Sequence, residues 1–370
     1  MKRKQITKAS GNLANASKAI IYSGRVARQT GFTLFELIIG ITVGLFVSLA
    51  AISVLINTRS LQSITTAASR MSENSRLAMD LLQRDLRSAG FAGCKPLLAD
   101  APVSLLTPSN HRFLDPSSDT AGIRGSYGNS STFTPPLNGT LLALSPSVES
   151  DFLSVRVPVE PMALGLSPPM TPALNIPQVG VNTVGNVIVT NDIVLVANCK
   201  ASVIFQVTEA DPFSTGLLSH AVGGGFDPGN STSDLKHVFR GDSTVYRLQT
   251  RHYYIAPGTH AGTSSMWRLS FPNTTGGAFP EEIVQGVDRM QFSYGLDKGN
   301  QSVNRYVRAD AVNDWSTVIA VRIQLLTSTV NDRTSLASKT ASYAGSSIAF
   351  ADRRLRSEAT TVVTLRNRAP

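Results

Sequence analysis

The sequence predicts an α+β protein in which one long N-terminal helix precedes an antiparallel β-sheet domain. Three observations predict this fold class. An apolar run extends from Phe32 to Ile56 with Glu36 as its one charged residue, an amphipathic pattern continues to about Ala89, and β-branched runs follow Cys94. No proline interrupts the chain between the start of the apolar run and Pro96, so a single helix can extend through both segments.

The apolar run is long enough to cross a bilayer, since about 20 apolar residues span the hydrocarbon core. A carboxylate is costly in that environment, which makes Glu36 a candidate functional residue. By the positive-inside rule, the basic flank before Phe32 predicts a cytoplasmic N-terminus and an exported remainder of the chain. This flank carries no acidic residue and the following basic ones: Lys2, Arg3, Lys4, Lys8, Lys18, Arg25 and Arg28.

Most of the net charge belongs to this flank. The whole chain is formally +9, whereas the part from Phe32 onward is formally +2. A nucleic-acid-binding protein is expected to carry a clustered basic face. The high pI therefore does not indicate a nucleic-acid partner, and none is predicted.

Residues 31–36 (GFTLFE), followed by an apolar helix, resemble the class III signal of type IV prepilins and type II secretion pseudopilins. The resemblance implies that a prepilin peptidase cuts between Gly31 and Phe32, that Phe32 becomes N-methylated, and that the apolar helix is retained. It also implies that Glu36, the fifth residue of the mature chain, meets the N-terminal amine of a neighbouring subunit during assembly. An ammonium group is the kind of partner that a buried carboxylate requires.

Two other interpretations of the N-terminal segment remain open. A single-pass signal anchor needs only the apolar run and its basic flank, and it does not explain Gly31, Phe32 and Glu36 in register. An ordinary secretory signal is compatible with the small residues of the segment 48–50 (SLA), and it predicts a mature chain that starts at Ala51. The 31-residue leader is also long for this class of signal, which predicts translation from an alternative start at Val26.

The amphipathic segment predicts that the helix continues to about Ala89, with Gly90 and Gly93 as stop signals. Its charged residues lie on the remaining surface, with several at the spacing of ion pairs along a helix. Small and apolar residues recur at steps of three and four, as expected for one buried stripe: Leu61, Ile64, Ala68, Met71, Ser75, Ala78 and Leu82.

The chain has two cysteines, Cys94 and Cys199, and both follow the apolar run. In an exported protein, two cysteines predict one disulfide rather than a metal site or a nucleophile. Two separate free thiols are the alternative. A disulfide would attach the end of the helix to the sheet domain.

The predicted strands alternate with long connections rich in turn residues. Residues 102–150, 158–179 and 216–234 are predicted to be irregular surface loops, with partner contact as a second interpretation. The strands are expected at residues 151–158, 187–198, 202–207, 244–255, 266–271, 283–294, 317–329 and 360–365.

Further segments narrow the resemblance to PilW-type minor pilins of the type IV pilus. Residues 76–94 (RLAMDLLQRDLRSAGFAGC) are similar to the helix end of that family, where an Ala-Gly-aromatic turn leads to a cysteine. Residues 197–207, residues 286–297 (GVDRMQFSYGLD), Trp315 with the strand after it, and the basic segment 353–368 also fit. The fold implied is pilin-like.

No enzymatic motif is found, so neither catalysis nor a cofactor is predicted. No nucleophile elbow or phosphate loop occurs, and the five histidines show no pair at helical metal-ligand spacing. Asp227, Asn230 and Asp234 have oxygens that suit calcium, but they lack the full ligand series of a known loop. Turn formation is the ordinary explanation for these residues, and no metal is predicted.

The resemblance implies a minor pilin that takes part in type IV pilus assembly or its initiation. It divides the chain into a cytoplasmic leader (1–31), a transmembrane half-helix (32–56), an amphipathic half-helix (57–93) and a β-rich domain outside the cytoplasm (94–370). The implied partners are the prepilin peptidase, other minor pilins, the major pilin and the inner membrane, and the mature protein is expected in the pilus at the cell surface. A minor pseudopilin of type II secretion, or a membrane-anchored surface binding protein or adhesin that does not polymerise, remain as alternatives.

Overall fold

A long helix, α1, opens the described part of the chain. The computed structural model describes residues 31–94, 102–107, 122–159, 164–166, 170, 178–182, 187–223, 225, 227–271, 280–297, 299–300, 302–331, 334 and 340–368. The predicted leader, apart from Gly31, and the alternative start at Val26 lie outside these residues.

Helix α1 extends from Leu34 to Ser88 without a break over 55 residues. This confirms the prediction of one helix through the apolar and the amphipathic segments. Gly90 follows the helix with a φ of 69°, the left-handed conformation that commonly terminates helices and that glycine adopts without steric cost.

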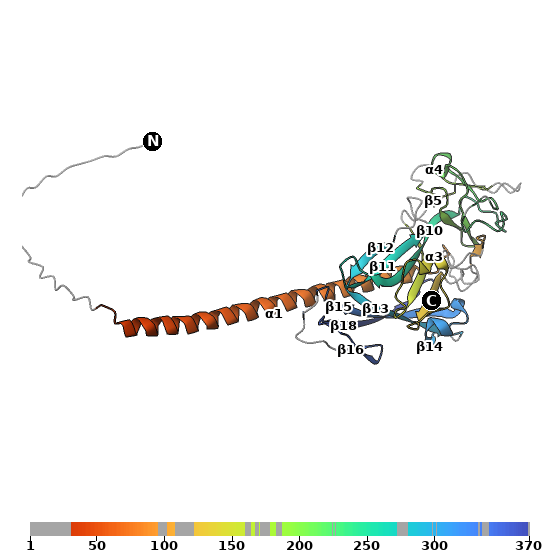
Figure 1. The fold of residues 1–370 in the computed structure, drawn as a ribbon. Coiled ribbons are helices and arrows are strands. Elements are labelled where there is room, and N and C mark those ends of the chain that lie inside the picture. The colour runs from red at the N-terminus through yellow and green to blue at the C-terminus, as the bar shows by residue number, and fades with distance from the viewer. Residues whose placement is uncertain are drawn as a thin grey trace, which may run out of the picture. The chain divides into compact units, whose positions relative to one another are not determined.

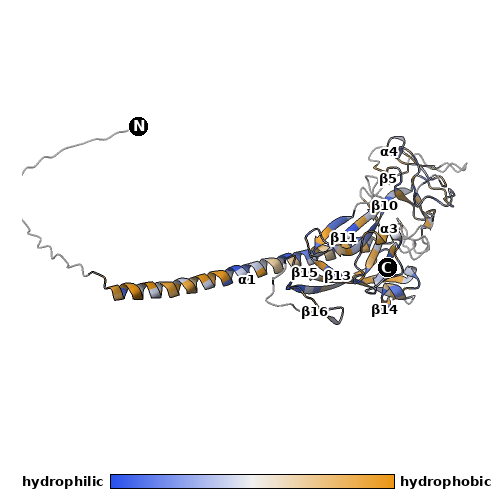
Figure 2. Ribbon diagram, viewed as in Figure 1, coloured by the Kyte–Doolittle hydropathy of each residue, from blue (hydrophilic) through white to orange (hydrophobic). Residues whose placement is uncertain are grey.

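The chain divides into two compact units, one up to Arg59 and one from Ser60 onward. In the first unit every described side chain is exposed, although most of them are apolar. Figure 2 shows mostly apolar residues along the first part of α1 and a mixture of hydrophilic and apolar residues along its later part. By length and composition α1 can cross a membrane, and no other described helix meets that test.

The second unit contains two main sheets (Figure 1). Except for the parallel pair β1–β8, the neighbouring strands of the larger sheet are antiparallel. Its strands are β1 (Val103–Ser104), β2 (Ile123–Gly128), β3 (Phe133–Thr134), β4 (Phe152–Pro158), β5 (Leu164–Gly165), β7 (Ile193–Ala197), β8 (Ser202–Gln206), β10 (Thr244–Pro257), β11 (Ser264–Phe271) and β12 (Glu281–Gln285).

The smaller sheet has the strand order β14-β13-β15-β18 and is entirely antiparallel. Its strands are β13 (Val287–Asp297), β14 (Val303–Val307), β15 (Val318–Ser328) and β18 (Arg356–Thr364). Two small sheets pair β6 (Gln178–Gly180) with β9 (Leu217–Ser219) and β16 (Thr340–Tyr343) with β17 (Ser346–Ala349). The short helices are α3 (Gly139–Leu142), α4 (Pro212–Thr215), η1 (Ala309–Ala311) and η2 (Trp315–Thr317).

The largest hydrophobic cluster joins the last turns of α1 to strands of both main sheets. On the helix, Ala78, Leu82 and Leu86 are completely buried. They share this cluster with Tyr253 of β10 and Phe292 of β13. The predicted stripe therefore does face the domain, and its burial is complete only in the last turns of α1.

Most of the predicted strands are confirmed, with two corrections. The strand expected at 283–294 is divided into β12 and β13 at Gly286, whose φ of 73° interrupts an extended run. A Cβ at this position would lie too close to the Ser328 carbonyl oxygen, so the close approach of β15 requires glycine here. The strand expected at 187–198 is shorter, because Asn191 has a φ of 73° and β7 begins only at Ile193.

The prediction that residues 102–150, 158–179 and 216–234 form only irregular loops is wrong. The described part of the first range contains β1, β2, β3 and α3, that of the second contains β5, and that of the third contains β9. Strand β2 has the sequence IRGSYG, which shows neither a continuous apolar run nor an alternation of apolar and polar residues. Gly125 is nonetheless required there, because a Cβ would clash with the Tyr294 hydroxyl group.

Candidate functional site

The first turn of α1 places Glu36 in a capping box. The Thr33 hydroxyl oxygen accepts a hydrogen bond from the Glu36 backbone N–H at 3.2 Å, and Glu36 Oε2 accepts one from the Thr33 N–H at 3.2 Å. This reciprocal pair satisfies two backbone donors that a helix start otherwise leaves unpaired. A carboxylate at this end is also favoured by the helix dipole.

Sequence reasoning missed this role of Thr33. The signal was present as the pattern Thr-x-x-Glu directly before an apolar run, which is the sequence signature of a capping box. Only Oε2 of Glu36 is engaged, because in the described part of the chain Oε1 accepts no hydrogen bond. One carboxylate oxygen therefore remains available for a further donor.

Gly31 and Phe32 lie just before α1 and are exposed. Phe32 is 85% exposed, and outside the chain neighbours of Gly31 no atom lies within 4 Å of where a Cβ on Gly31 would be. Further along α1, Gly40 and Gly44 have equally open surroundings. Their spacing is that of small residues that permit close approach of a second membrane helix.

In the second unit, α1 is attached to the sheet through Asp85. This side chain is 2% exposed, and its two oxygens accept hydrogen bonds from Arg251 Nη1 at 2.8 and 2.9 Å. The Tyr253 hydroxyl donates to Asp85 Oδ2 at 2.6 Å. Burial, and then the nearby Asp85 charge, raise the pKa of Tyr253, so this hydroxyl remains a donor.

The end of α1 is capped by the C-terminal segment. The Asn367 side chain donates hydrogen bonds to the carbonyl oxygens of Ser88 at 3.3 Å and Ala89 at 3.0 Å. These carbonyls would otherwise lack a partner at the helix terminus. The next residue, Arg368, donates through Nη1 to the carbonyl oxygen of Trp315 at 2.7 Å.

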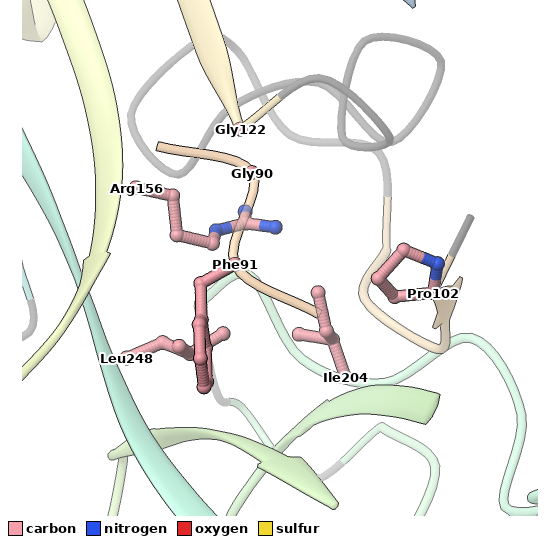
Figure 3. A pocket seen from close by; sticks show the side chains of 7 residues that line it. All are labelled: Gly90, Phe91, Pro102, Gly122, Arg156, Ile204 and Leu248. Atoms are coloured by element: carbon pink, nitrogen blue, oxygen red, sulfur yellow. The ribbon is translucent and has the colours of Figure 1, made fainter. Parts of the chain in front are cut away.

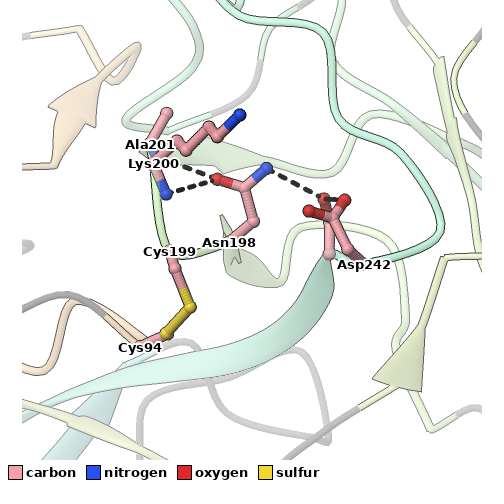
Figure 4. The surroundings of a disulfide bond; sticks show 7 residues. Cys94, Asn198, Cys199, Lys200, Ala201 and Asp242 are labelled. Atoms are coloured by element: carbon pink, nitrogen blue, oxygen red, sulfur yellow. Dashed lines mark hydrogen bonds between the residues drawn. A yellow bond between two sulfur atoms is a disulfide. The ribbon is translucent and has the colours of Figure 1, made fainter.

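Cys94 and Cys199 form a disulfide with a Cα–Cα distance of 5.0 Å (Figure 4). Cys94 lies six residues after the end of α1, and Cys199 lies in the turn between β7 and β8. The turn is ordered by Asn198 Oδ1, which accepts hydrogen bonds from the backbone N–H groups of Lys200 and Ala201 at 2.9 Å each. The bond thus connects the chain after the helix to the larger sheet, as the cysteine count predicts.

A small pocket lies beside the end of α1. Its cavity measures about 10 Å³, the lower limit for a single water molecule, so an organic substrate does not fit. The residues that line it come from several elements (Figure 3): Gly90, Phe91, Pro102, Gly122, Arg156, Ile204 and Leu248.

Two of the three residues considered for calcium, Asn230 and Asp234, make other contacts with their side chains. The Asn230 side chain binds the backbone of β8, accepting from Gln206 N–H at 2.8 Å and donating to Gln206 O at 2.8 Å. Asp234 pairs with Lys236 at 2.6 Å. Within the described ranges, no group of three His, Cys, Asp or Glu residues suits a metal ion.

Gly31, Phe32 and Glu36 thus lie together at the start of α1, whereas Cys94 and Cys199 lie in the second unit. Residues 252–367 match the family of type IV pilus-assembly protein W, PilW. The resemblance to the PilW family is confirmed for this part of the chain. The matched residues begin within β10, directly after Arg251, and end at Asn367, which caps α1. The match does not include α1.

Other comparisons add little to the PilW match. A type IV-like pilin from Thermus thermophilus is similar over 81% of this chain and 99% of its own, at 13% identity and a TM-score of 0.33. At that TM-score the likeness decides nothing about this chain. None of the curated proteins matches it. The PilW match and the apolar α1 together support a role related to the type IV pilus and anchoring in a membrane.

Proposed function

We propose that this chain is a minor pilin that takes part in type IV pilus assembly. One observation carries the proposal: a carboxylate, Glu36, caps the first turn of a helix whose following residues are apolar and exposed, in a chain with a PilW-type C-terminal part. Placing this charge in lipid costs free energy, and within α1 and its first turn only the hydrogen bonds of the capping box offset that cost. A partner on another subunit explains why the charge is there.

In this proposal the prepilin peptidase removes residues 1–31 by cutting between Gly31 and Phe32. The bond lies outside α1, which begins at Leu34, so cleavage requires no unwinding of the helix. The new amine of Phe32 is then methylated. The mature chain keeps residues 32–56 in the inner membrane, with its N-terminus on the cytoplasmic side, and exports residues 57–370.

Assembly then pairs Glu36 with the Phe32 amine of a neighbouring pilin. The Oε1 atom is the acceptor, because the capping box engages only Oε2. Leaving the bilayer costs α1 its lipid contacts, and packing against helices of other minor pilins and the major pilin offsets this loss. Gly40 and Gly44 allow such helices to approach closely.

The proposal is tested by replacing Glu36 with Gln in the native organism and counting surface pili. Gln at this position of a capping box still accepts the Thr33 N–H, so the substitution removes the charge without removing the cap. We expect fewer surface pili, with the protein still processed and present in membranes at the normal level. Glu73→Gln is the matched control, since Glu73 is exposed on the same helix outside the apolar run.

Thr33→Ala separates the cap from the charge. It removes the hydroxyl acceptor for the Glu36 N–H and keeps the carboxylate, so we expect a smaller loss of pili than for Glu36→Gln. Normal piliation by Glu36→Gln would contradict the proposal and favour a membrane-anchored binding protein that does not polymerise. A mature N-terminus at Ala51 would contradict the proposed processing.

A further inference from the structure

Arg354 is a buried arginine whose guanidinium makes no hydrogen bond or ion pair among the described residues. It lies two residues before β18 and is 7% exposed. Its Nε is shielded from solvent and makes no hydrogen bond, and across the described residues its guanidinium forms no ion pair. Burying an arginine without an ion pair costs free energy, and among the described residues the attraction of Asp352, which lies beyond ion-pair distance, offsets it only in part.

Other buried arginines of the same domain are paired. Arg247 is 7% exposed, like Arg354, and its Nε lies 2.8 Å from Asp192 Oδ2. Arg356, two residues along the chain, lies 2.7 Å from Asp288 Oδ2 through its Nε. Arg368, which is 2% exposed, donates through Nη1 to backbone carbonyl oxygens. The guanidinium of Arg354 has neither kind of partner in the described part of the chain.

The nearest acid on the same segment is already engaged. Asp352 accepts hydrogen bonds from Arg356 Nη1 at 2.6 Å and Nη2 at 2.7 Å, and from the Arg354 backbone N–H at 3.1 Å. The hydrogen bonds from Arg356 hold the pKa of Asp352 below its usual value. The carboxylate is therefore fully ionised and oriented toward Arg356, and its charge reaches the Arg354 guanidinium only at longer range.

The guanidinium of Arg354 reaches an open position at a glycine. Gly262 lies in the turn between β10 and β11 with a φ of 73°. A Cβ on this glycine would lie 3.6 Å from Arg354 Nη2 and within 4 Å of no other atom outside its chain neighbours. Among the described residues, an atom placed over this exposed turn thus touches only Nη2 besides the chain neighbours of Gly262, so a small anion can approach the guanidinium from this side.

We propose that Arg354 and the turn at Gly262 form a binding site for a carboxylate side chain of a neighbouring pilin subunit. A guanidinium presents donors in a planar arrangement that matches a carboxylate. A local cost that is only partly compensated locally is typical of a functional position. The choice of a protein carboxylate over another anion rests on the proposed function, in which the domain is surrounded by other pilins.

The anion site is tested on the full-length protein in detergent, with acetate as the probe carboxylate. Thermal unfolding is followed in chloride and in acetate at equal ionic strength. We expect acetate to raise the Tm of the wild type and Arg354→Met to lose this shift. Arg366→Met, which removes an exposed arginine of the same segment, should retain it. Only differences between variants count, because anions also act on protein surfaces in general.

Arg354→Met should also unfold in chloride at a Tm no lower than that of the wild type, because it removes an unpaired buried charge and keeps much of the side-chain volume. Arg354→Lys keeps the charge without the planar donor pair and should show a reduced acetate shift. An acetate shift that persists in Arg354→Met, or a wild type without one, would overturn the site. So would a lower Tm of Arg354→Met in chloride, since this would indicate a partner within the chain.

In cells, Arg354→Met should lower the number of surface pili while Arg366→Met leaves it unchanged. An acetate shift that depends on Arg354, together with normal piliation by Arg354→Met, would overturn the assignment of the ligand to a neighbouring pilin. The Glu36→Gln experiment is read separately. If Glu36→Gln lowers piliation, the proposed function stands whatever the result for Arg354.

Discussion

The attachment of α1 to its domain should depend on the charge of Asp85. Asp85→Asn keeps the shape of the side chain and an acceptor for the Tyr253 hydroxyl, but it removes the ionic partner of Arg251. Breaking a buried ion pair typically costs 3–5 kcal/mol of unfolding free energy. The Arg251 side chain retains 17% exposure, so water partly solvates it and we expect about 3 kcal/mol.

The assay is urea unfolding of the full-length protein in detergent, followed by tryptophan fluorescence. The free energies of unfolding come from the midpoints and slopes of the transitions. Asp80→Asn is the control, because Asp80 is exposed on the same helix and should change the free energy by less than about 0.5 kcal/mol. A loss below about 1 kcal/mol for Asp85→Asn, which is no more than an ordinary hydrogen bond contributes, would refute this reasoning.

A double-mutant cycle separates the ion pair from other effects of the substitution. Arg251→Met removes the cation and leaves the hydrogen bond from Tyr253 in place. Residues in direct contact usually show coupling energies of about 0.5–3 kcal/mol. A coupling near zero between Asp85→Asn and Arg251→Met would mean that the ion pair is not what stabilises the contact.

Two further predictions concern the disulfide and a buried acid. The double variant Cys94→Ser/Cys199→Ser should lower the unfolding free energy by roughly 4–5 kcal/mol in the chain-entropy model, because the disulfide closes a loop with a sequence separation of 105. Reductant should then have no further effect on the urea midpoint of this variant. Equal midpoints of the oxidised wild type and the double variant would contradict this prediction. Burial raises the pKa of Asp151 to about 7 against an ordinary value of 3.8, so between about pH 4 and pH 7 the folded state binds a proton that the unfolded state lacks, and stability falls as pH rises through this window. Asp151→Asn should weaken that fall when unfolding is measured across the same pH range, and an unchanged pH profile would exclude Asp151 as its source.

The fold could be predicted well where one strong periodic pattern decides. Helix α1 was predictable because no proline and no two adjacent glycines occur between Leu34 and Gly90. The division between β12 and β13 was not, because a single glycine inside an apolar run is compatible with a continuous strand, and only the approach of the Ser328 carbonyl requires the turn. Strand β2 was missed for a related reason. Gly125 lies in this strand because the Tyr294 hydroxyl leaves no space for a Cβ, and Tyr294 lies far away in sequence.

The candidate site divides in the same way. Thr33 and Glu36 interact within one helical turn, so their contact follows from sequence spacing alone. The partners of Asp85 could not be found from sequence, because Arg251 and Tyr253 lie more than 160 positions away and no local pattern connects them to the helix. The sequence does not single out Asp85, which lies among other charged residues of an amphipathic segment.

These contacts bear on how α1 would transmit force. If α1 is drawn out of the bilayer as proposed, the load reaches the domain through the last turns of the helix. The apolar stripe of Ala78, Leu82 and Leu86 is held by hydrophobic contact, which is not directional in itself. Hydrogen bonds depend on angle as well as distance, so the bonds of Asp85 also fix the rotation of α1 about its axis.

The C-terminal segment and the disulfide complete this attachment at the end of the helix. Asn367 binds carbonyls of the last turn, and Cys94 ties the following residues covalently to the turn after β7. Loss of Asp85 alone should therefore leave α1 connected to the domain but less firmly fixed in its rotation. Because a helix presents different residues on each face, such rotation would change which side chains α1 offers to a neighbouring pilin, even in a domain that remains folded.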